Sequence, residues 1–133
     1  MKYLLDTNII IYFLKGSMPA LIDRFKSVKC QDIYIPSVVM AELEYGARNS
    51  KAYGDSISAI KSFTDNFNKV DFDEASAASY GKIRADLKTK GTIIGANDLM
   101  IAANALAGDY ILVTHNTGEF DRVNGLRVED WAE

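Results

Sequence analysis

The sequence predicts an α/β fold in which helices flank a mainly parallel central sheet, and two features of the chain indicate it. Short apolar runs such as YLL and YILVT are typical of buried strands, and they alternate with longer segments of helical spacing. This alternation favours a parallel sheet. The 133 residues include only two prolines and no Ser/Gly-rich linker, so we expect a single domain over 1–133.

Local signals place the elements of the first half. Gly16 ends the first helix, Pro19 suits the first turn of the second, and Ser37 is positioned to cap the third. The predicted elements are, in order, a strand at 3–5, helices at 9–14 and 20–28, a strand at 32–36 and helices at 37–49 and 53–67.

The second half is bounded by equally clear residues. Asp73 is expected to cap a long helix that Gly91 ends, and Asn124–Gly125 predicts a turn before the last strand. The predicted elements are a strand at 69–72, helices at 74–90 and 95–109, and strands at 110–114 and 126–128.

Composition narrows the class of protein. Cys30 and His115 are the only cysteine and histidine, so a metal would be held mainly by oxygen ligands rather than in a cysteine-based zinc site. We expect no signal peptide, because Asp6 and Asn8 interrupt the first apolar stretch, and no membrane span, because no apolar run reaches 18 residues. A lone cysteine suits a reducing, cytoplasmic location.

Two acidic residues of the first half stand where chemistry is expected. Asp6 directly follows a strand, at the edge where parallel sheets bind ligands, although it also suits the role of helix cap. Glu42 shares a helix face with Val39 and Leu43 and so borders an apolar stripe, whereas Glu44 points elsewhere. The alternative for Glu42 is a structural salt bridge.

Acidic and polar residues of the second half repeat this arrangement. Asp98 lies on a helix face with small apolar residues, although an acid in a first turn also complements the helix dipole. In THNTGEF, Asn116 and Glu119 follow the strand that ends at Thr114, on the same sheet edge as Asp6. The alternative is that the polar residues of this loop are only exposed to solvent and have no role in a site. For Asp121, exposure at the surface is the favoured interpretation.

Four carboxylates that converged on one point would repel one another strongly. At a mean separation of about 6 Å and an effective dielectric constant of about 20, each pair repels by roughly 3 kcal/mol. Such a cluster either takes up protons or holds a divalent cation, and oxygen ligands favour Mg²⁺, or Mn²⁺, over zinc.

Four motifs, in order and spanning nearly the whole chain, carry a resemblance to a known family. The segments LLDTN, AELEYGA, IGANDLMIAANA and LVTHNTGEFDRVNGLRVEDW resemble those of PIN-domain nucleases, and more narrowly those of VapC toxins of bacterial toxin–antitoxin pairs. The resemblance implies a PIN-like fold and metal-dependent hydrolysis of RNA phosphodiester bonds.

The resemblance also implies roles for individual residues. The acidic site maps onto Asp6, Glu42, Asp98 and Glu119 as catalytic, metal-holding residues. The supporting positions of the family motifs map onto Asn8, Thr114 and Asn116. Many PIN domains carry Asp where Asn116 stands, and a neutral amide there weakens a second metal position. His115 is expected to be a loop residue beside the site rather than a catalytic base.

Partners follow from the same resemblance. A VapB-type antitoxin would lie across the toxin and place an arginine among the carboxylates, and DNA would be bound only through that antitoxin. VapC toxins usually pair as homodimers, for which the face of Ile57, Ile60 and Phe63 is one candidate surface and ordinary core the favoured alternative. The likeness to enteric VapC makes initiator tRNA, cut in its anticodon stem-loop, the preferred substrate.

Binding RNA requires cations, because the formal net charge of −3 indicates no general attraction for nucleic acid. The alternative for a basic run is a solvated helix face. The candidate RNA-binding residues are Arg48, Lys82, Arg84, Lys88, Lys90 and Arg122.

Rival functions remain open at this point. A PIN-fold module that binds RNA or protein without cutting is the main alternative. A receiver-like or phosphatase-like domain is disfavoured because the first motif reads D-T-N, and the glycine-rich nucleotide-binding motifs are absent.

Overall fold

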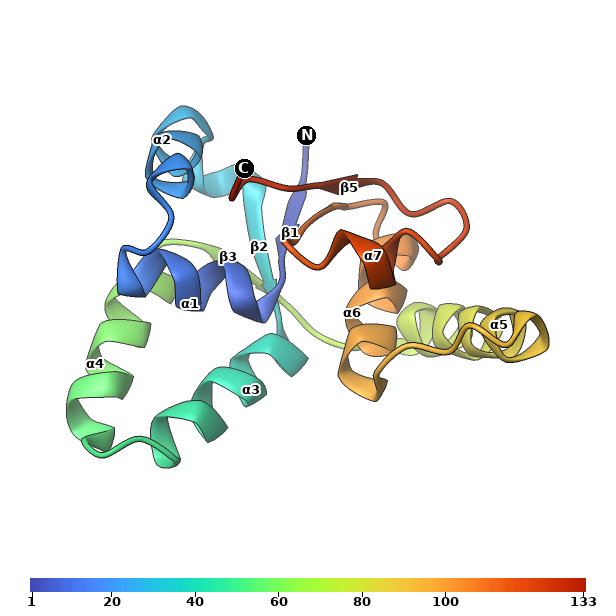
Figure 1. Ribbon diagram of the computed structural model, residues 1–133, viewed down its shortest axis with the longest axis horizontal. Helices are drawn as coiled ribbons and strands as arrows, with labels where there is room; N and C mark the ends of the chain where they lie inside the picture. The colour runs from blue at the N-terminus through green and yellow to red at the C-terminus, as the bar shows by residue number, and fades with distance from the viewer.

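The computed structural model describes residues 1–133 and contains a wholly parallel five-stranded sheet flanked by helices (Figure 1). The sheet order is β3-β2-β1-β4-β5, which puts β1 in the centre. The strands are β1 (Tyr3–Leu5), β2 (Ile33–Pro36), β3 (Asn68–Val70), β4 (Ile111–Val113) and β5 (Val128–Glu129). The predicted α/β fold class is confirmed.

Each strand is connected to the next by at least one helix. The helices are α1 (Thr7–Lys15), α2 (Pro19–Ser27), α3 (Ser37–Arg48), α4 (Tyr53–Thr64), α5 (Glu74–Lys90), α6 (Ala96–Ala107) and α7 (Thr117–Phe120), with a 3₁₀ turn η1 at Cys30–Asp32. Every predicted strand and helix is present. The sequence pattern did not reveal η1 or the four-residue α7, both too short to show a helical period.

Helix ends test the predicted capping residues. Asp73 accepts a hydrogen bond from the Ser76 backbone N–H at 2.9 Å, and Gly91 ends α5 with φ of +70°, as predicted. The predicted cap at Ser37 is wrong, because α3 already begins at this residue and its hydroxyl donates instead to Asp71 at 3.0 Å.

The predicted helix at 53–67 is too long by three residues. The Asn66 side-chain amide donates to the carbonyl oxygens of Ser62 and Phe63, at 2.9 and 3.0 Å, and closes α4 after Thr64. The chain is therefore free to enter β3 at Asn68, one residue before the predicted start.

The hydrophobic core lies between the sheet and its helices. β1 is apolar throughout and β4 fully buried, as expected for central strands of a parallel sheet. Ile60 and Phe63 of α4 are buried and Ile57 is partly buried against them. This face, a candidate dimer surface in the sequence, is thus part of the core.

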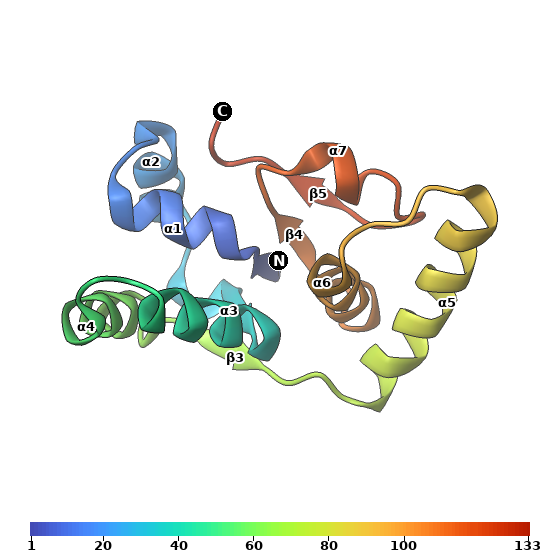
Figure 2. The same cartoon turned by 60° about the horizontal axis from the view of Figure 1, so that its bottom comes forward.

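The carboxyl ends of the central strands meet at one edge, which positions the candidate site. Leu5 of β1 is in register with Val113 of β4, so the next residues, Asp6 and Thr114, come side by side. Figure 2, which looks toward that edge, shows α1, α3, α6 and α7 around it.

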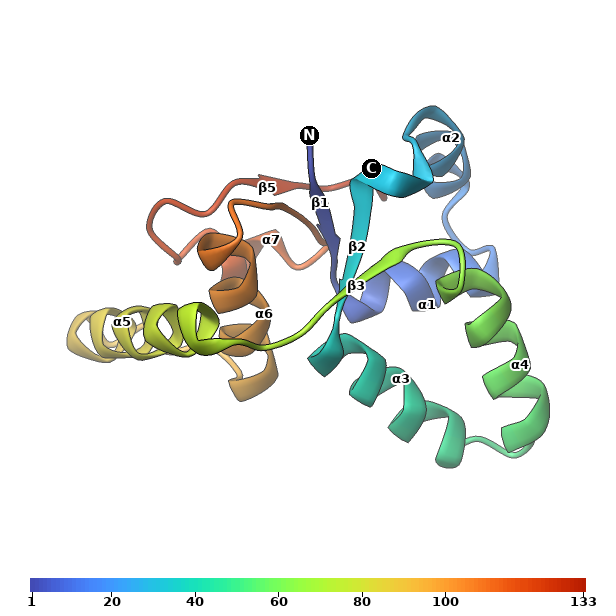
Figure 3. The same ribbon diagram turned by 180° about the vertical axis from the view of Figure 1, so that it is seen from behind.

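Outside this centre, α5 packs mainly on α6 and projects from the molecule (Figures 1 and 3). Seen from behind in Figure 3, β3 forms one edge of the sheet, and α4 and α5 lie on opposite sides of it. None of the helices combines the length and the apolar character that crossing a membrane requires.

Candidate active site

Asp6 is fixed at the end of β1 by two neutral donors. The Thr114 hydroxyl donates to Oδ2 at 2.7 Å and the Thr7 backbone N–H donates to Oδ1 at 2.8 Å. The second bond makes Asp6 the N-cap of α1, so the structural alternative for this residue is also correct. With only 4% of its surface exposed, Asp6 is a buried carboxylate with no cationic partner.

Glu42 joins this site from α3. It lies one turn after Val39 and beside Leu43, both buried, so its side chain leaves the edge of the apolar stripe, as predicted. Its Oε1 accepts a hydrogen bond from the Thr7 hydroxyl at 2.7 Å and makes no salt bridge. The salt-bridge alternative is therefore wrong, and Glu44 takes that role by pairing with Arg48.

Asp98 and Glu119 come together from α6 and α7. Their carboxyl groups are close enough to share a hydrogen bond. Glu119 also accepts from the Asn116 amide and, at 3.1 Å, from the backbone N–H of Gly95 at the start of α6. These contacts tie the loop after β4 to the first turn of the helix that carries Asp98.

The pKa values of Asp6, Asp98 and Glu119 are shifted by burial and by the neighbouring acids. Burial is the main cause that raises the pKa of Asp6, and the charges of Glu42 and Glu119 raise it further, against the hydrogen bonds from Thr114 and Thr7. Burial, the shared hydrogen bond with Glu119 and the neighbouring charges raise the pKa of Asp98 to about 7. Glu119 shifts in the opposite direction, because its hydrogen bond with Asp98 holds its pKa below the usual value.

The donors of this site fit a hard divalent cation. All four side chains offer carboxylate oxygens, their mutual repulsion appears in the raised pKa of Asp98, and no lysine or arginine forms an ion pair with any of them. The four carboxylates are not gathered tightly enough for any three of them to form a complete metal site by themselves. Asp6, Glu42 and Glu119 accept hydrogen bonds from neighbouring groups.

The predicted supporting residues differ in what they contact. Thr114 is fully buried and binds Asp6, and Asn116 binds Glu119. Asn8 is exposed and makes no side-chain hydrogen bond, so the contact with Asp6 that we expected from it comes from Thr7. Thr7 was missed in the sequence, although its place between Asp6 and Asn8 in the D-T-N motif offered a signal.

His115 lies on the loop beside the site, as expected. Its Nδ1 is 2.8 Å from Asp130, and its ring packs edge-on against Tyr12. These contacts orient the ring through the C-terminal segment and not through the four acids. Asp121 is exposed, in agreement with its predicted surface role.

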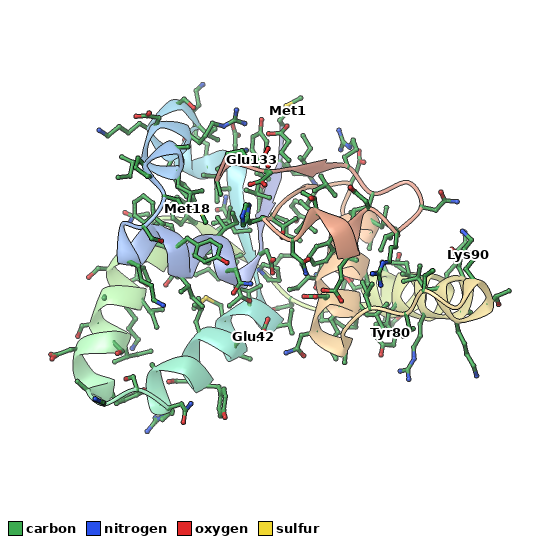
Figure 4. All side chains as sticks on the ribbon, viewed as in Figure 1. Met1, Met18, Glu42, Tyr80, Lys90 and Glu133 are labelled. Carbon is green, nitrogen blue, oxygen red and sulfur yellow. The ribbon has the colours of Figure 1, made fainter.

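The candidate RNA-binding cations are spread over three regions. Figure 4 shows Glu42 on α3 and labels Tyr80 and Lys90 on α5, which lies beyond α6. On α5, Arg84 is bonded to Tyr80 and Lys90 to Asp86, whereas Lys82 and Lys88 make no side-chain hydrogen bond.

The other two cations come from other elements, and Arg122 donates to the carbonyl oxygen of Ile93, just after α5, at 3.2 Å. Arg48 stacks on Tyr53 with its guanidinium 3.9 Å from the ring centre. Arg122 is the cation beside the acids, since its charge lowers the pKa of Glu119.

Comparison with known proteins identifies the family to which this chain belongs. The PIN domain family model matches residues 3–126. The chain is 39% identical over 132 residues to the tRNA(fMet)-specific endonuclease VapC of Shigella flexneri, and equally to Ribonuclease VapC2 of Haemophilus influenzae; both alignments cover 99% of each chain.

A solved structure agrees. VapBC2 from Rickettsia felis, bound to a DNA fragment from its promoter, contains a chain with a TM-score of 0.93 and 36% identity that covers 98% of this chain and 99% of that one. Because the full-length relatives are named ribonucleases and endonucleases, the alternative of a non-catalytic binding module is not supported. The chain therefore belongs to the PIN-domain family and, within it, to the VapC ribonucleases.

Proposed function

We propose that this chain is the toxin of a type II toxin–antitoxin pair, and that it hydrolyses RNA with a divalent ion held by Asp6, Glu42, Asp98 and Glu119. One observation carries the proposal: four acids from four separate segments lie close enough for their charges to raise the pKa values of Asp6 and Asp98, and none forms an ion pair within the chain. PIN-domain nucleases depend on divalent metals. The oxygen-only donors favour Mg²⁺, with Mn²⁺ as a substitute.

The proposed roles follow from burial and contacts. Asp6 is the most buried of the four acids and its charge raises the pKa of Asp98, so these two are the proposed primary ligands. Glu42 and Glu119 would help to hold the ion or would orient the attacking water. When bound, the ion would lower the pKa of a coordinated water and neutralise charge on the scissile phosphate. In-line attack on phosphorus breaks the bond to the 3′ oxygen and leaves 5′-phosphate and 3′-hydroxyl ends.

The protein's own residues also prepare the site. Thr7 and Thr114 hold Asp6 and Glu42 by hydroxyl and backbone donors that orient the carboxylates without neutralising them. The charge therefore stays available for a cation. Arg122, beside Glu119, is positioned to meet a phosphate next to the one that is cut.

For the substrate, we propose initiator tRNA, cut in its anticodon stem-loop. The support is the 39% identity, over almost the full chain, to a tRNA(fMet)-specific endonuclease. Lys82 and Lys88 on the projecting α5, both exposed and without side-chain hydrogen bonds, are candidates for contacts with the remoter phosphates of such a folded RNA.

For regulation, we propose a VapB-type antitoxin that lies in a groove between α1, α3 and α4. This groove has a volume of about 310 Å³, is lined mostly by apolar side chains such as Leu14, Leu43 and Ile60, and reaches Glu42 at one end. An apolar segment in the groove would carry an arginine to the carboxylates. The relatives of known structure include VapBC complexes bound to DNA. Accordingly, we propose that DNA is bound through the antitoxin.

We further propose that residues 1–133 act as a single domain, in the cytoplasm where the RNA substrates lie, and as a homodimer. The α4 face of Ile57, Ile60 and Phe63 is part of the core, so the dimer would use another surface.

Two glutamates on α3 provide a matched test. Glu42→Gln removes an acid of the proposed site, whereas Glu44→Gln changes an exposed acid two residues away that pairs with Arg48. With purified protein and an initiator tRNA transcript in Mg²⁺, we expect Glu42→Gln to lose cleavage and Glu44→Gln to retain it. Sequencing of new RNA 5′ ends locates the cut, and equal cleavage by both variants would refute the assignment.

A further inference from the structure

A second hollow adjoins the apolar groove, and the two share Ile11 and Glu42 in their walls. It has a volume of about 500 Å³, within the range of small-molecule sites, and lies between the first turn of α1, the exposed side of α3 and the start of α6. Its lining includes the apolar side chains of Ile11 and Val38 and the carboxylate of Glu42. A molecule in this hollow would thus touch an acid of the proposed active site.

Tyr45 is the one aromatic side chain that lines the hollow. It lies one helical turn after Glu42, on the same side of α3, and 70% of its surface is exposed. Its hydroxyl makes no hydrogen bond, and its ring makes no contact with another ring or a cation, in contrast to Tyr53 under Arg48. The packing of the fold does not explain this side chain.

Two amides complete the hollow. Asn8 of α1 and Asn97 of α6 both line it, are exposed, and make no side-chain hydrogen bond. Each amide offers one acceptor and two donors in a plane. A flat aromatic ring and two free amides, arranged around apolar surface, match the two faces that a nucleobase presents: a π surface and an edge of donors and acceptors.

We propose that this hollow binds one unpaired base of the RNA, next to the phosphate that is cut, with Tyr45 as its stacking platform and Asn8 and Asn97 at its edge. The inference rests on the proposed ribonuclease function and specifies how that substrate is held. A protein segment is the weaker match, because an apolar side chain stacked on Tyr45 would leave both amides without partners.

The test separates base recognition from phosphate recognition. The probes are an oligoadenylate of eight nucleotides and an abasic ribose-phosphate chain of the same length and charge, both with Ca²⁺ in place of Mg²⁺, and gels confirm that the RNA stays intact. Stacking of one base on an aromatic ring strengthens binding by about tenfold. We expect the wild type to prefer oligoadenylate by that factor, Tyr45→Ala to lose the preference, and Tyr45→Phe to keep it.

Two further variants sharpen the result. Tyr45→Trp adds an exposed indole to a chain whose only tryptophan, Trp131, is 1% exposed, so oligoadenylate should quench the new fluorescence and the abasic chain should not. Tyr53→Ala is the matched control: a tyrosine of the neighbouring helix whose ring face already carries Arg48. It should keep the full preference.

The outcomes are distinct. A Tyr45→Ala protein with the wild-type preference overturns the base site, and so does a change in sedimentation alone, which would assign Tyr45 to a contact between two copies of the chain. A wild type that prefers oligoadenylate but cuts no RNA in Mg²⁺ would refute the proposed function and leave the base site standing. In cleavage assays, Tyr45→Ala should raise KM about tenfold and leave kcat unchanged.

Discussion

Asp98→Asn is expected to stabilise the metal-free protein at pH 8 while abolishing RNA cleavage, an unusual pair of effects for one substitution. At pH 8 the wild-type Asp98 is ionised, although its surroundings favour the protonated form. Burial, Glu119 and the charge of Asp6 raise its pKa to about 7. Asparagine has nearly the same shape as the protonated acid and donates an N–H toward Glu119 without a charge. The substitution removes the repulsion and, with it, a proposed metal ligand.

The size of the effect follows from the pKa. A shift from 3.8 to about 7 would correspond to about 4 kcal/mol for an isolated buried group. Because Asp98 is only half-buried, solvent screening reduces this to about 1–2 kcal/mol. For a chain of 133 residues, we expect the Tm of Asp98→Asn to exceed that of the wild type by roughly 3–8 °C at pH 8.

The effect depends on pH with a definite sign. A carboxyl group whose pKa is raised in the folded state keeps a proton that the unfolded chain has released, so the stability of the wild type falls as pH rises from about 4 to about 7. The lowered pKa of Glu119 acts in the opposite direction only below pH 5. The advantage of Asp98→Asn should therefore be small at pH 5 and full at pH 8.

Thermal unfolding in EDTA at these two pH values, repeated with MgCl₂, provides the assay. Magnesium should raise the Tm of the wild type, because an ion that binds only the folded state stabilises it, and should have little effect on the variant. A variant that is less stable than the wild type at pH 8, or that gains as much from magnesium, would contradict the electrostatic account of the site.

Three further changes test neighbouring parts of the structure. Thr114→Val should lower the free energy of unfolding by about 1–3 kcal/mol, because the buried Asp6 loses its 2.7 Å donor; an unchanged urea midpoint would count against this. Asp73→Ala removes the cap of α5 and should lower it by about 1 kcal/mol without slowing cleavage of a short RNA hairpin, so slower cleavage would link α5 to the site. Arg122→Gln should reduce the salt dependence of RNA binding by about one phosphate contact, measured as the slope of affinity against salt concentration, and an unchanged slope would exclude such a contact.

Most of the fold was predictable because each element has a local cause. Glycines in the left-handed region end α1 and α5, and Asp73 caps α5, so those boundaries can be placed from the residues themselves. Ser37 failed as a cap because its hydroxyl has a partner elsewhere in the fold, Asp71, the residue that follows β3. That choice depends on tertiary structure, which no local pattern contains.

The position of Asp6 beside the Thr114 loop was predictable for a different reason. Asp6 and the Thr114 loop follow neighbouring parallel strands, and the geometry of a sheet forces such residues to one edge. Thr7 was not predicted, because its importance lies in two contacts, one through the backbone and one through the hydroxyl. The exposure of Tyr45 was also not predicted, because a helical sequence pattern does not indicate whether a side chain on the helix surface has neighbours from other elements.

The way in which the fold holds its acids also explains how one site can serve two partners. Hydroxyl, amide and backbone donors fix Asp6, Glu42 and Glu119 in place but leave their charge, and Arg122 acts on Glu119 only from beyond salt-bridge distance. The missing positive charge has to come from outside the chain. A divalent ion and an antitoxin arginine both supply it, and they need the same oxygens. On the proposed function, the active and inhibited states therefore differ in which cation occupies the site, and the sheet edge itself can stay unchanged.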